Sequence, residues 1–513
     1  MTLNDVLLRP AGLYPEKAAV KYLGIRLTYD EFLRNVCRTA NALRLSGVGP
    51  GNTVCIACRN SIEYMEAMFA VSFVGAVPAL LNWRISAVGI AGMIKQTGAR
   101  IVFISNTEVQ TIEYLRDHCP YLRLIITGHD PALPSNYADF IHGMPESFSP
   151  VQRGAEDIAL IMFTSGTTGR AKGVAIPNRA VDCQVTRCSH NGFWNKDDIF
   201  LCMSPLCHSI SVSVMALIYS GGELLLCPPE YVRYSSKVLE LIESERVTST
   251  AMVPTVINRI VTYMEENGLR NDTVNCIHYG ASPMSRQLIE RCSKVFACKF
   301  HQGYGMTETY GTVATLLPED HFDEKHLLSV GRPVSGTQFK VVDDKGLELP
   351  FCKAGEICIK CNSVMSGYIG MPAETNEVLI DGWYHSGDIG YIDCDGYIYL
   401  KDRKSDMIIS GGENVFPQEI ERCIMELTDD VASVSVVGLS DDIWGECIAA
   451  AVVRAPGSHI SSEQIVNYCG ERLGRYKKPK KVIFVDELPT NDTGKVSRIL
   501  TAKLFSTEGF QAK

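Results

Sequence analysis

The residues that could do chemistry are densest in a short loop of glycines and hydroxyls, Thr164-Ser165-Gly166-Thr167-Thr168-Gly169, with Lys172 and Gly173 close behind it. The loop follows an apolar run over Ile158–Phe163 that predicts a buried strand. Glycines let a turn present its backbone N–H groups, hydroxyls add donors, and the lysine adds a positive charge. The combination favours a polyphosphate site over a plain Ser/Thr/Gly turn. It is not the P-loop pattern, because no Gly-Lys-Ser/Thr tripeptide occurs in the chain.

The segments that must position this loop alternate between strand and helix patterns. Thr53–Ala57 and Ala76–Leu81 are strand-like, and the helical pattern of Ile62–Phe73 lies between them. A second alternating block covers residues 157–330, whereas the strands over 331–400 are short and interrupted by glycine. We therefore expect an α/β protein with helix-covered parallel sheets, followed by a small barrel or distorted sheet.

The last 110 or so residues predict a separate α+β unit. Val431–Val437, Cys447–Arg454 and Lys481–Val485 have the composition of strands. Ser461 to Gln464 has the pattern of a capping box, which predicts a helix from there to about Leu473.

The composition is that of an ordinary globular protein of two or three domains. The 513 residues are 46% hydrophobic and 21% charged, and 49 Lys and Arg against 58 Asp and Glu give a net charge of −9. Without a net basic field, general binding to nucleic acid is not expected. The longest apolar run, Ala67–Leu81, is too short to span a bilayer, and residues 1–15 show no secretory signal. We expect a soluble, cytoplasmic protein without stable membrane insertion; homo-oligomerisation stays open.

The 19 cysteines are too sparse for a disulfide scaffold, and reduced thiols are expected. Two C-x-x-C pairs, Cys55/Cys58 and Cys358/Cys361, raise the alternative of zinc binding. Both pairs fall in strand-like stretches, where residues three apart face opposite sides of a sheet. Buried, unreactive thiols are therefore the favoured interpretation.

Seven motifs, in family order, make the chain similar to the adenylate-forming superfamily, which comprises acyl-CoA synthetases, aryl-CoA ligases, firefly luciferase and nonribosomal-peptide adenylation domains. They are the Thr/Ser/Gly loop, Pro205-Leu-Cys-His208, Tyr279-Gly-Ala-Ser-Pro283, Gly303-Tyr-Gly-Met-Thr-Glu308, Gly382-Trp-Tyr-His-Ser-Gly-Asp388, Lys401-Asp-Arg-Lys-Ser-Asp406 with Gly411-Gly-Glu-Asn414, and Pro489-Thr-Asn-Asp-Thr-Gly-Lys495. The resemblance extends over nearly the whole chain.

The resemblance implies a role in ATP binding for most of the matched residues. Thr164 to Gly169 with Lys172 would hold the phosphates, and the adenine would lie against Gly280, Ala281, Ser282, Gln302, Gly303 and Tyr304. Thr307 would donate to the α-phosphate, and Glu308, with Thr164, would hold Mg²⁺. Asp388 would bind the ribose, and the guanidinium of Arg403 would bind the same ribose or the phosphate. The plainer alternatives are a surface Glu308, a turn-capping Asp388 and a Tyr304 that packs in the core.

Other matched residues would serve the acid and the thiol. His208 would border the carboxylate, and Lys495 would bridge this carboxylate and the α-phosphate as the acyl adenylate forms. Gly411, Gly412 and Glu413 would face CoA, with Lys477 in a basic cluster near its phosphates. From residue type alone, His208 is equally compatible with a structural role, and both lysines with solvated surface positions.

Three positions depart from the family pattern. Ala171 stands where proline usually precedes the loop lysine, and Cys361 stands where glycine usually ends the Gly-Glu-Ile motif. Ser405 occupies the pivot between domains, which is usually Asp or Lys. Serine changes φ and ψ freely, so we expect the hinge itself to be intact.

The resemblance implies an N-terminal adenylation domain, residues 1–402, and a mobile C-terminal domain, residues 403–513, that turns about Ser405 between two half-reactions. The expected function is that of an AMP-forming carboxylic acid–CoA ligase that uses ATP, CoA and Mg²⁺. Small residues near the expected acid pocket indicate a roomy pocket, compatible with a fatty, aromatic or steroidal acid, and the resemblance to fatty-acid and aryl ligases implies a hydrophobic acid. The rivals are an adenylation enzyme that loads a carrier protein, a luciferase-like oxygenase and a nucleotide-binding regulator without turnover; Lys495 and Glu308 argue against the last.

Overall fold

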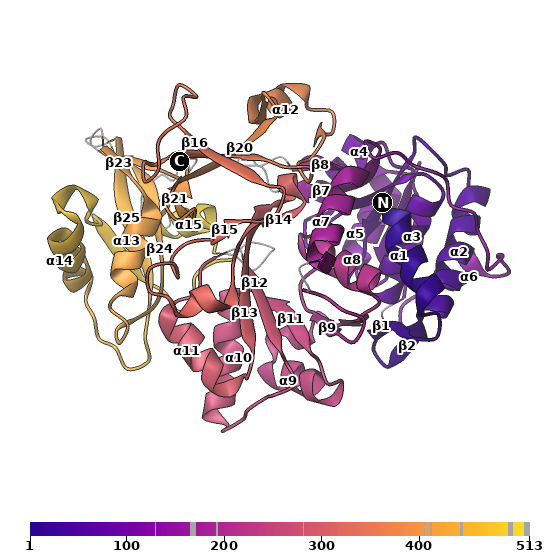
Figure 1. Ribbon diagram of the computed structural model, residues 1–513, viewed down its shortest axis with the longest axis horizontal. Helices are drawn as coiled ribbons and strands as arrows, with labels where there is room; N and C mark the ends of the chain where they lie inside the picture. The colour runs from indigo at the N-terminus through magenta and orange to yellow at the C-terminus, as the bar shows by residue number, and fades with distance from the viewer. Residues whose placement is uncertain are drawn as a thin grey trace. The chain divides into compact units, whose positions relative to one another are not determined.

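The computed structural model describes residues 1–128, 130–164, 171–190, 193–280, 282–404, 406–410, 413–441, 445–490 and 496–506. The chain forms two compact units (Figure 1). The first unit comprises Met1–Gln338 and Ile359–Tyr384, and the second comprises Phe339–Cys358 and His385–Lys513. The chain therefore passes between the units three times. The domain boundary expected after residue 402 stays a prediction, since the compact units divide the chain differently.

The phosphate-loop candidate belongs to a seven-stranded sheet of the first unit. Its order is β18 (Gly367–Tyr368), β8 (Lys172–Pro177), β7 (Ile158–Thr164), β4 (Val77–Leu80), β3 (Thr53–Ala57), β5 (Ile101–Ser105) and β6 (Arg123–Thr127). The five strands from β7 to β6 are parallel, as the alternating pattern predicts. The strand β8 is antiparallel to β7, and β18 is antiparallel to β8.

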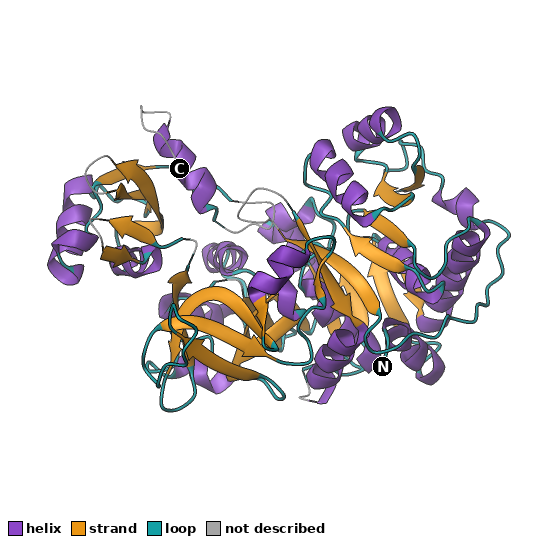
Figure 2. Cartoon of the chain, turned by 90° about the horizontal axis from the view of Figure 1, so that it is seen from above, coloured by secondary structure: helices purple, strands orange, loops and turns teal. Residues whose placement is uncertain are grey.

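Helices lie on both faces of this sheet, which Figure 2 shows as a layer of strands between helices. The helices α4 (Ala87–Thr97) and α5 (Val109–His118) bury Ile90, Met93 and Leu115 against one face. The helix α3 (Ile62–Phe73) contacts β3 and β4 and has the predicted bounds. A short helix α6 (Tyr137–Ile141) follows β6.

The second sheet of the first unit has nine strands. Its order is β15 (Arg332–Pro333), β14 (Gly311–Leu316), β13 (Lys299–Met306), β12 (Cys276–Gly280), β11 (Ser249–Met252), β9 (Ile199–Cys202), β10 (Glu223–Leu226), β1 (Ala18–Tyr22) and β2 (Ile25–Thr28). One face is covered by α9 (Ser235–Ser244), α10 (Pro254–Glu266) and α11 (Arg286–Val295), which share one apolar core with the strands. The unit also contains α1 (Leu3–Leu13), α2 (Tyr29–Leu45), α7 (Asn178–His190), α8 (Ile210–Ser220) and α12 (Pro372–Val378).

Two smaller sheets account for the strands of the second unit, although the short strand Leu379–Ile380 of one of them belongs to the residues of the first unit. One has the order β16 (Gln338–Val342), β17 (Gly355–Lys360), β20 (Trp383–Ile392) and β19 (Leu379–Ile380), with β21 (Ile398–Arg403) paired to β20. The other has the order β23 (Glu413–Val415), β22 (Ile408–Ser410), β25 (Gly445–Arg454) and β24 (Val431–Asp441), with β26 (Lys481–Phe484) paired to β25. The helices α13 (Pro417–Met425) and α14 (Ser462–Leu473) cover one face of it, and α15 (Arg498–Ser506) covers the other.

Several local expectations are met in detail. Ser461 Oγ accepts a hydrogen bond from Gln464 N, and Gln464 Oε1 accepts one from Ser461 N, which is the predicted capping box. Cys55, Cys58 and Cys358 are buried, and burial raises the pKa of each thiol to about 12, so these cysteines are protonated. Among the described residues, no helix is both long and apolar enough to cross a bilayer.

Candidate active site

The structure places Thr164 and Lys172 at the two ends of the predicted phosphate loop. Thr164 is the last residue of β7, Lys172 is the first of β8, and the two are paired across the hairpin. The remaining loop residues, Ser165, Gly166, Thr167, Thr168 and Gly169, lie outside the described residues. Lys172 Nζ lies 4.9 Å from the ring centroid of Tyr368, a cation–π contact.

The same tyrosine holds Glu308. The Tyr368 hydroxyl donates a hydrogen bond of 2.9 Å to Glu308 Oε1, and the glutamate is 9% exposed. Burial and the nearby Glu308 carboxylate raise the pKa of Tyr368 above its ordinary value, so it stays a donor. Tyr368 thus joins the cation at the base of the loop to the carboxylate expected to hold Mg²⁺.

Glu308 lies in a tight turn that the surrounding chain fixes firmly. The 3₁₀ turn η2 (Thr307–Thr309) follows β13 and contacts β7 and β8. Thr309 is fully buried, accepts a hydrogen bond from Met306 N and donates one to Gly311 O. From α7, Gln184 Nε2 donates to Thr309 O. The predicted residues Thr307 and Glu308 are therefore presented by a rigid turn beside the phosphate loop.

The residues predicted to contact adenine come from two neighbouring parallel strands. Gly280 at the end of β12 is paired with Gly303 in β13. A Cβ on Gly280 would lie 2.7 Å from Gly303 O, so only glycine fits there. Gln302 is buried and accepts a hydrogen bond of 3.2 Å from the Tyr279 hydroxyl. Tyr304 is also buried, Ser282 is exposed, and Ala281 lies outside the described residues.

His208 lies in the loop between β9 and α8 and is partly buried. Its backbone N donates to Pro205 O, and its carbonyl accepts from Ser211 N just inside α8. The backbone of the loop is therefore ordered by its own hydrogen bonds. Whether His208 contacts an acid stays a prediction.

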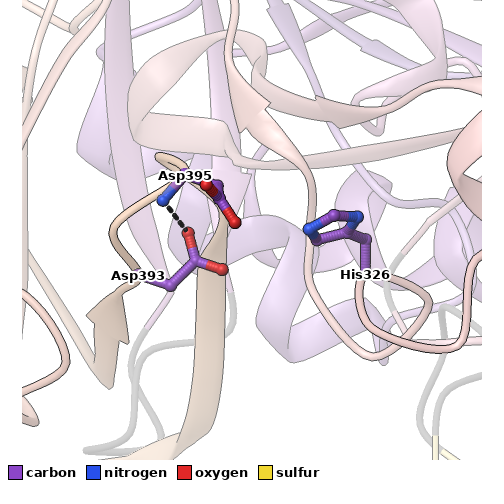
Figure 3. Close-up of side chains that lie close together, drawn as sticks. All are labelled: His326, Asp393 and Asp395. Atoms are coloured by element: carbon purple, nitrogen blue, oxygen red, sulfur yellow. Dashed lines mark hydrogen bonds between the residues drawn. The ribbon is translucent and has the colours of Figure 1, made fainter.

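In the second unit, the two residues predicted to bind ribose form an ion pair. Asp388 in β20 and Arg403 in β21 are register partners, and Arg403 Nε lies 3.1 Å from Asp388 Oδ1. Asp388 is buried, whereas the Arg403 side chain is 58% exposed. Asp393 Oδ1 accepts a hydrogen bond from Asp395 N in the turn that closes this hairpin (Figure 3).

A further carboxylate, Glu356 in β17, supports Asp388. Glu356 Oε1 accepts a hydrogen bond from Gly387 N at 3.2 Å, and its Oε2 lies 3.5 Å from Lys404 Nζ. Ser386 Oγ accepts a hydrogen bond from Asp388 N. Gly387 has a φ of +71°, a conformation that suits glycine. The backbone at Asp388 is therefore held by hydrogen bonds to Glu356 and Ser386.

Lys477 is not a solvated lysine. Its Nζ lies 2.6 Å from Glu419 Oε1, and its side chain is 16% exposed. Burial lowers the pKa of Lys477, but hydrogen bonding and attraction to Glu419 outweigh it and raise the pKa overall. Lys495, Gly411 and Gly412 lie outside the described residues, and Glu413 is described only by its backbone in β23.

Sequence reasoning missed Tyr368, Glu356 and Gln184. Tyr368 reaches Glu308 because β18 pairs with β8, almost 200 residues away in the chain, and no local pattern signals that pairing. Glu356 belongs to the Gly-Glu-Ile motif, which could have drawn attention to it.

An open groove of about 850 Å³ in the first unit, lined by Arg179, Lys360 and Met365 among others, contains none of the predicted site residues.

Within the first unit the ends of the predicted phosphate loop are paired beside the turn of Glu308, and within the second unit Asp388 and Arg403 are paired. A family model described as AMP-binding enzyme matches residues 8–369, and one described as AMP-binding enzyme C-terminal domain matches residues 419–495. The chain belongs to the AMP-binding enzyme family. It is an acid–thiol ligase, an AMP-forming acyl-CoA synthetase of α/β fold.

Relatives named for different carboxylic acids and different thiol acceptors are similar to this chain over nearly their whole length. A fatty acid–[acyl-carrier-protein] ligase of Streptomyces coeruleorubidus is 31% identical, over 94% of this chain and 92% of the relative. A 2-succinylbenzoate–CoA ligase of Geobacillus sp. (strain WCH70) is 33% identical, over 97% and 96%. The structure of o-succinylbenzoate coenzyme A synthetase of Bacillus subtilis in complex with ATP and magnesium ion superposes with a TM-score of 0.83 at 28% identity, covering 96% and 98%.

Proposed function

We propose that this ligase activates a hydrophobic carboxylic acid at a centre built from Glu308, Lys172 and Tyr368. The observation that carries the proposal is the shared contact of Tyr368 with the loop lysine and the buried glutamate. A carboxylate is suited to bind Mg²⁺ and a lysine to bind phosphate, and Tyr368 contacts both side chains. In the first step, the acid's carboxylate oxygen attacks the α-phosphorus of ATP, and pyrophosphate leaves as the acyl adenylate forms.

The chain offers oxygen ligands that fit Mg²⁺. Glu308 supplies a carboxylate, and Thr164 supplies a hydroxyl at the end of β7, a strand that contacts the η2 turn. Such hard oxygen donors, completed by phosphate oxygens, are the ligands that Mg²⁺ prefers. The ion, when bound, would neutralise charge on the phosphates. Tyr368 fixes one oxygen of Glu308, and Lys172, which lies over the ring of the same tyrosine, would face the phosphates.

The ribose and the thiol are assigned to the second unit. Asp388 would accept from ribose hydroxyls, and the exposed Arg403 would donate, because the pair already holds both groups in fixed orientation. Lys495 would stabilise the charge that crowds between carboxylate and α-phosphate. After a turn about Ser405, the thiolate attacks the acyl carbon, and AMP leaves. Gly411, Gly412, Glu413 and Lys477 would line that thiol site, with Glu419 orienting Lys477.

The names of two relatives support a fatty or an aromatic acid, two of the acid classes expected for this chain. One acts on a fatty acid and another on 2-succinylbenzoate. The first is also named for an acyl carrier protein rather than CoA, so a carrier protein is the second candidate acceptor.

A panel of fatty, aromatic and steroidal acids, each assayed for pyrophosphate release with ATP and Mg²⁺, tests the proposal. Release with at least one hydrophobic acid, and with short polar acids at no more than background, is expected. Adding free CoA or an acyl carrier protein then separates the two acceptors, because only the true acceptor gives a thioester and AMP. Activity confined to polar acids would overturn the acid class.

A further inference from the structure

One arginine of the second unit holds three carboxylates at once. Arg498, the first residue of α15, places Nη1 2.7 Å from Asp402 Oδ1 and 2.8 Å from Asp406 Oδ2, and Nη2 3.0 Å from Glu421 Oε2. The side chain of Asp402 is completely buried, and that of Arg498 is 21% exposed. Burial lowers the pKa of Arg498, but attraction to the three carboxylates outweighs this effect and raises the pKa above its ordinary value.

Asp402 connects this cluster to the ribose pair. Its Oδ1 also accepts a hydrogen bond from the backbone N of Arg403, and its Oδ2 accepts one from Gln418 N at the start of α13. Asp406 N in turn donates to Arg403 O. The backbone of Arg403 is therefore held from both sides by residues that Arg498 binds. Arg403 is the partner of Asp388.

In sequence, Arg498 lies shortly after Lys495. Thr490 pairs with Val496, and Ser497 N donates a hydrogen bond of 2.9 Å to Pro489 O, so the loop that contains Lys495 is closed at its base. Arg498 follows this base directly. Lys495 is three residues before it in sequence. The base of the lysine loop is thus tied, through Arg498 and Asp402, to the backbone of Arg403.

We infer that Arg498 is a positioning residue for adenylation: in the arrangement of the second unit that the structure shows, it sets where the base of the Lys495 loop stands relative to the ribose-binding pair. The later turn about Ser405 would break its contact with Asp402, which precedes the pivot. The inference rests on the proposed function. It assigns Arg498 no contact with substrate. Arg403 and Lys495, the residues proposed to contact the nucleotide, are 92 residues apart in sequence. The side chain of Arg498 links the two segments through Asp402 and Asp406. Arginine is suited to this role because its planar fork binds several carboxylates in fixed geometry.

The test compares Arg498→Lys with Arg472→Lys in the full chain. Lysine keeps the charge but loses the fork, so it cannot hold all three carboxylates. Arg472 is a matched control, because it pairs with Glu426 on the exposed surface of the same unit. Each variant is assayed with an accepted acid for ATP–pyrophosphate exchange, for ATP KM, and for thioester formation from synthetic acyl-AMP and CoA.

We expect Arg498→Lys to slow exchange by about tenfold to a hundredfold, the scale for misplacing a catalytic group by about 1 Å. ATP KM and thioester formation should change by no more than about twofold, and Arg472→Lys should leave all three unchanged. Equal loss in both half-reactions, or no loss in exchange, overturns the inference in favour of a purely structural cluster. Should Arg498→Lys fail to fold, Asp406→Asn removes one contact at a partly exposed partner, and a loss confined to exchange is again required. A wild-type protein inactive with every acid would instead refute the proposed function.

Discussion

At the scale of single residues, the site depends on side chains with more than one task. Tyr368 supports Glu308 through its hydroxyl and Lys172 through its ring. Asp402 accepts hydrogen bonds from two backbone N–H groups while it pairs with Arg498. Removal of one atom from such a residue is more informative than removal of the whole side chain.

Tyr368→Phe separates the two tasks of that tyrosine. The variant keeps the ring beneath Lys172 but leaves Glu308 Oε1 without its hydroxyl donor. A hydrogen bond to a charged group contributes about 1.5–3 kcal/mol, so kcat/KM for adenylation should fall by roughly tenfold to a hundredfold. Pyrophosphate exchange at several Mg²⁺ concentrations measures the loss. Tyr114→Phe, on the distant helix α5, is the control. Unchanged exchange in a folded Tyr368→Phe protein would separate Tyr368 from the metal-binding carboxylate.

Asp388→Ala tests the ribose assignment. Loss of a charged hydrogen bond of about 1.5–3 kcal/mol should raise the KM for ATP by on the order of tenfold or more. Isothermal titration with ATP would give the same answer independently of turnover. Glu356→Gln is an informative companion, because it keeps an acceptor for Gly387 N but loses the charge that faces Lys404. An ATP KM that Asp388→Ala leaves unaltered would remove the assignment.

At the scale of elements, local patterns predicted strands and caps well and distant pairings poorly. The alternation of β3, α3 and β4 and the Ser461 capping box depend on neighbouring residues, so the sequence contains their full signal. The contact of β18 with β8 depends on chain segments almost 200 residues apart. Tyr368 was therefore missed, although the loop and Glu308 that it joins were both predicted.

Paired strands of the nine-stranded sheet also hold a partly buried histidine stack. His278 in β12 is paired with His301 in β13, their ring centroids are 5.5 Å apart, and Trp194 stacks on His278. Burial lowers the pKa of His278 to about 3 and that of His301 to about 4. Both rings are therefore neutral in the folded protein at pH 7. The unfolded chain binds their protons near pH 6.5, so acid favours unfolding.

We expect the stack to destabilise the protein as pH falls below about 6.5, by about 1.4 kcal/mol per pH unit for each histidine. Glu66 acts in the opposite direction, because burial raises the pKa of its carboxyl to about 7 and the folded state favours its protonation. Thermal unfolding of wild type and His278→Gln, measured from pH 7.5 to pH 5, separates the effect of the histidine stack from that of Glu66. The variant should lose less stability with acid than wild type does. Parallel pH profiles would show that His278 does not contribute.

At the scale of the whole molecule, the function requires two half-reactions with different demands. Lys495 is assigned to the first alone, so Lys495→Ala should slow acyl-AMP formation by about 10²–10³, the scale for losing one preorganised electrostatic donor. Thioester formation from synthetic acyl-AMP and CoA should be nearly normal, because under the proposed turn about Ser405 the lysine would by then have left the site with its domain. Equal loss in both steps would assign Lys495 to folding or CoA binding.

The path of the chain through the two compact units has a practical consequence for protein engineering. The stretch Phe339–Cys358 belongs with His385–Lys513, although the connection between them runs through the first unit. A gene fragment that begins near residue 403 would therefore lack the whole of β16, β17 and β20, and with them Glu356 and Asp388. Exchange of C-terminal segments between related ligases at that junction would leave the Asp388–Arg403 pair with one member from each parent. Chimaeras joined there would need both parents to agree at this hairpin, whereas a graft that carries β16, β17, β20 and β21 together would bring the pair and its supports from one parent.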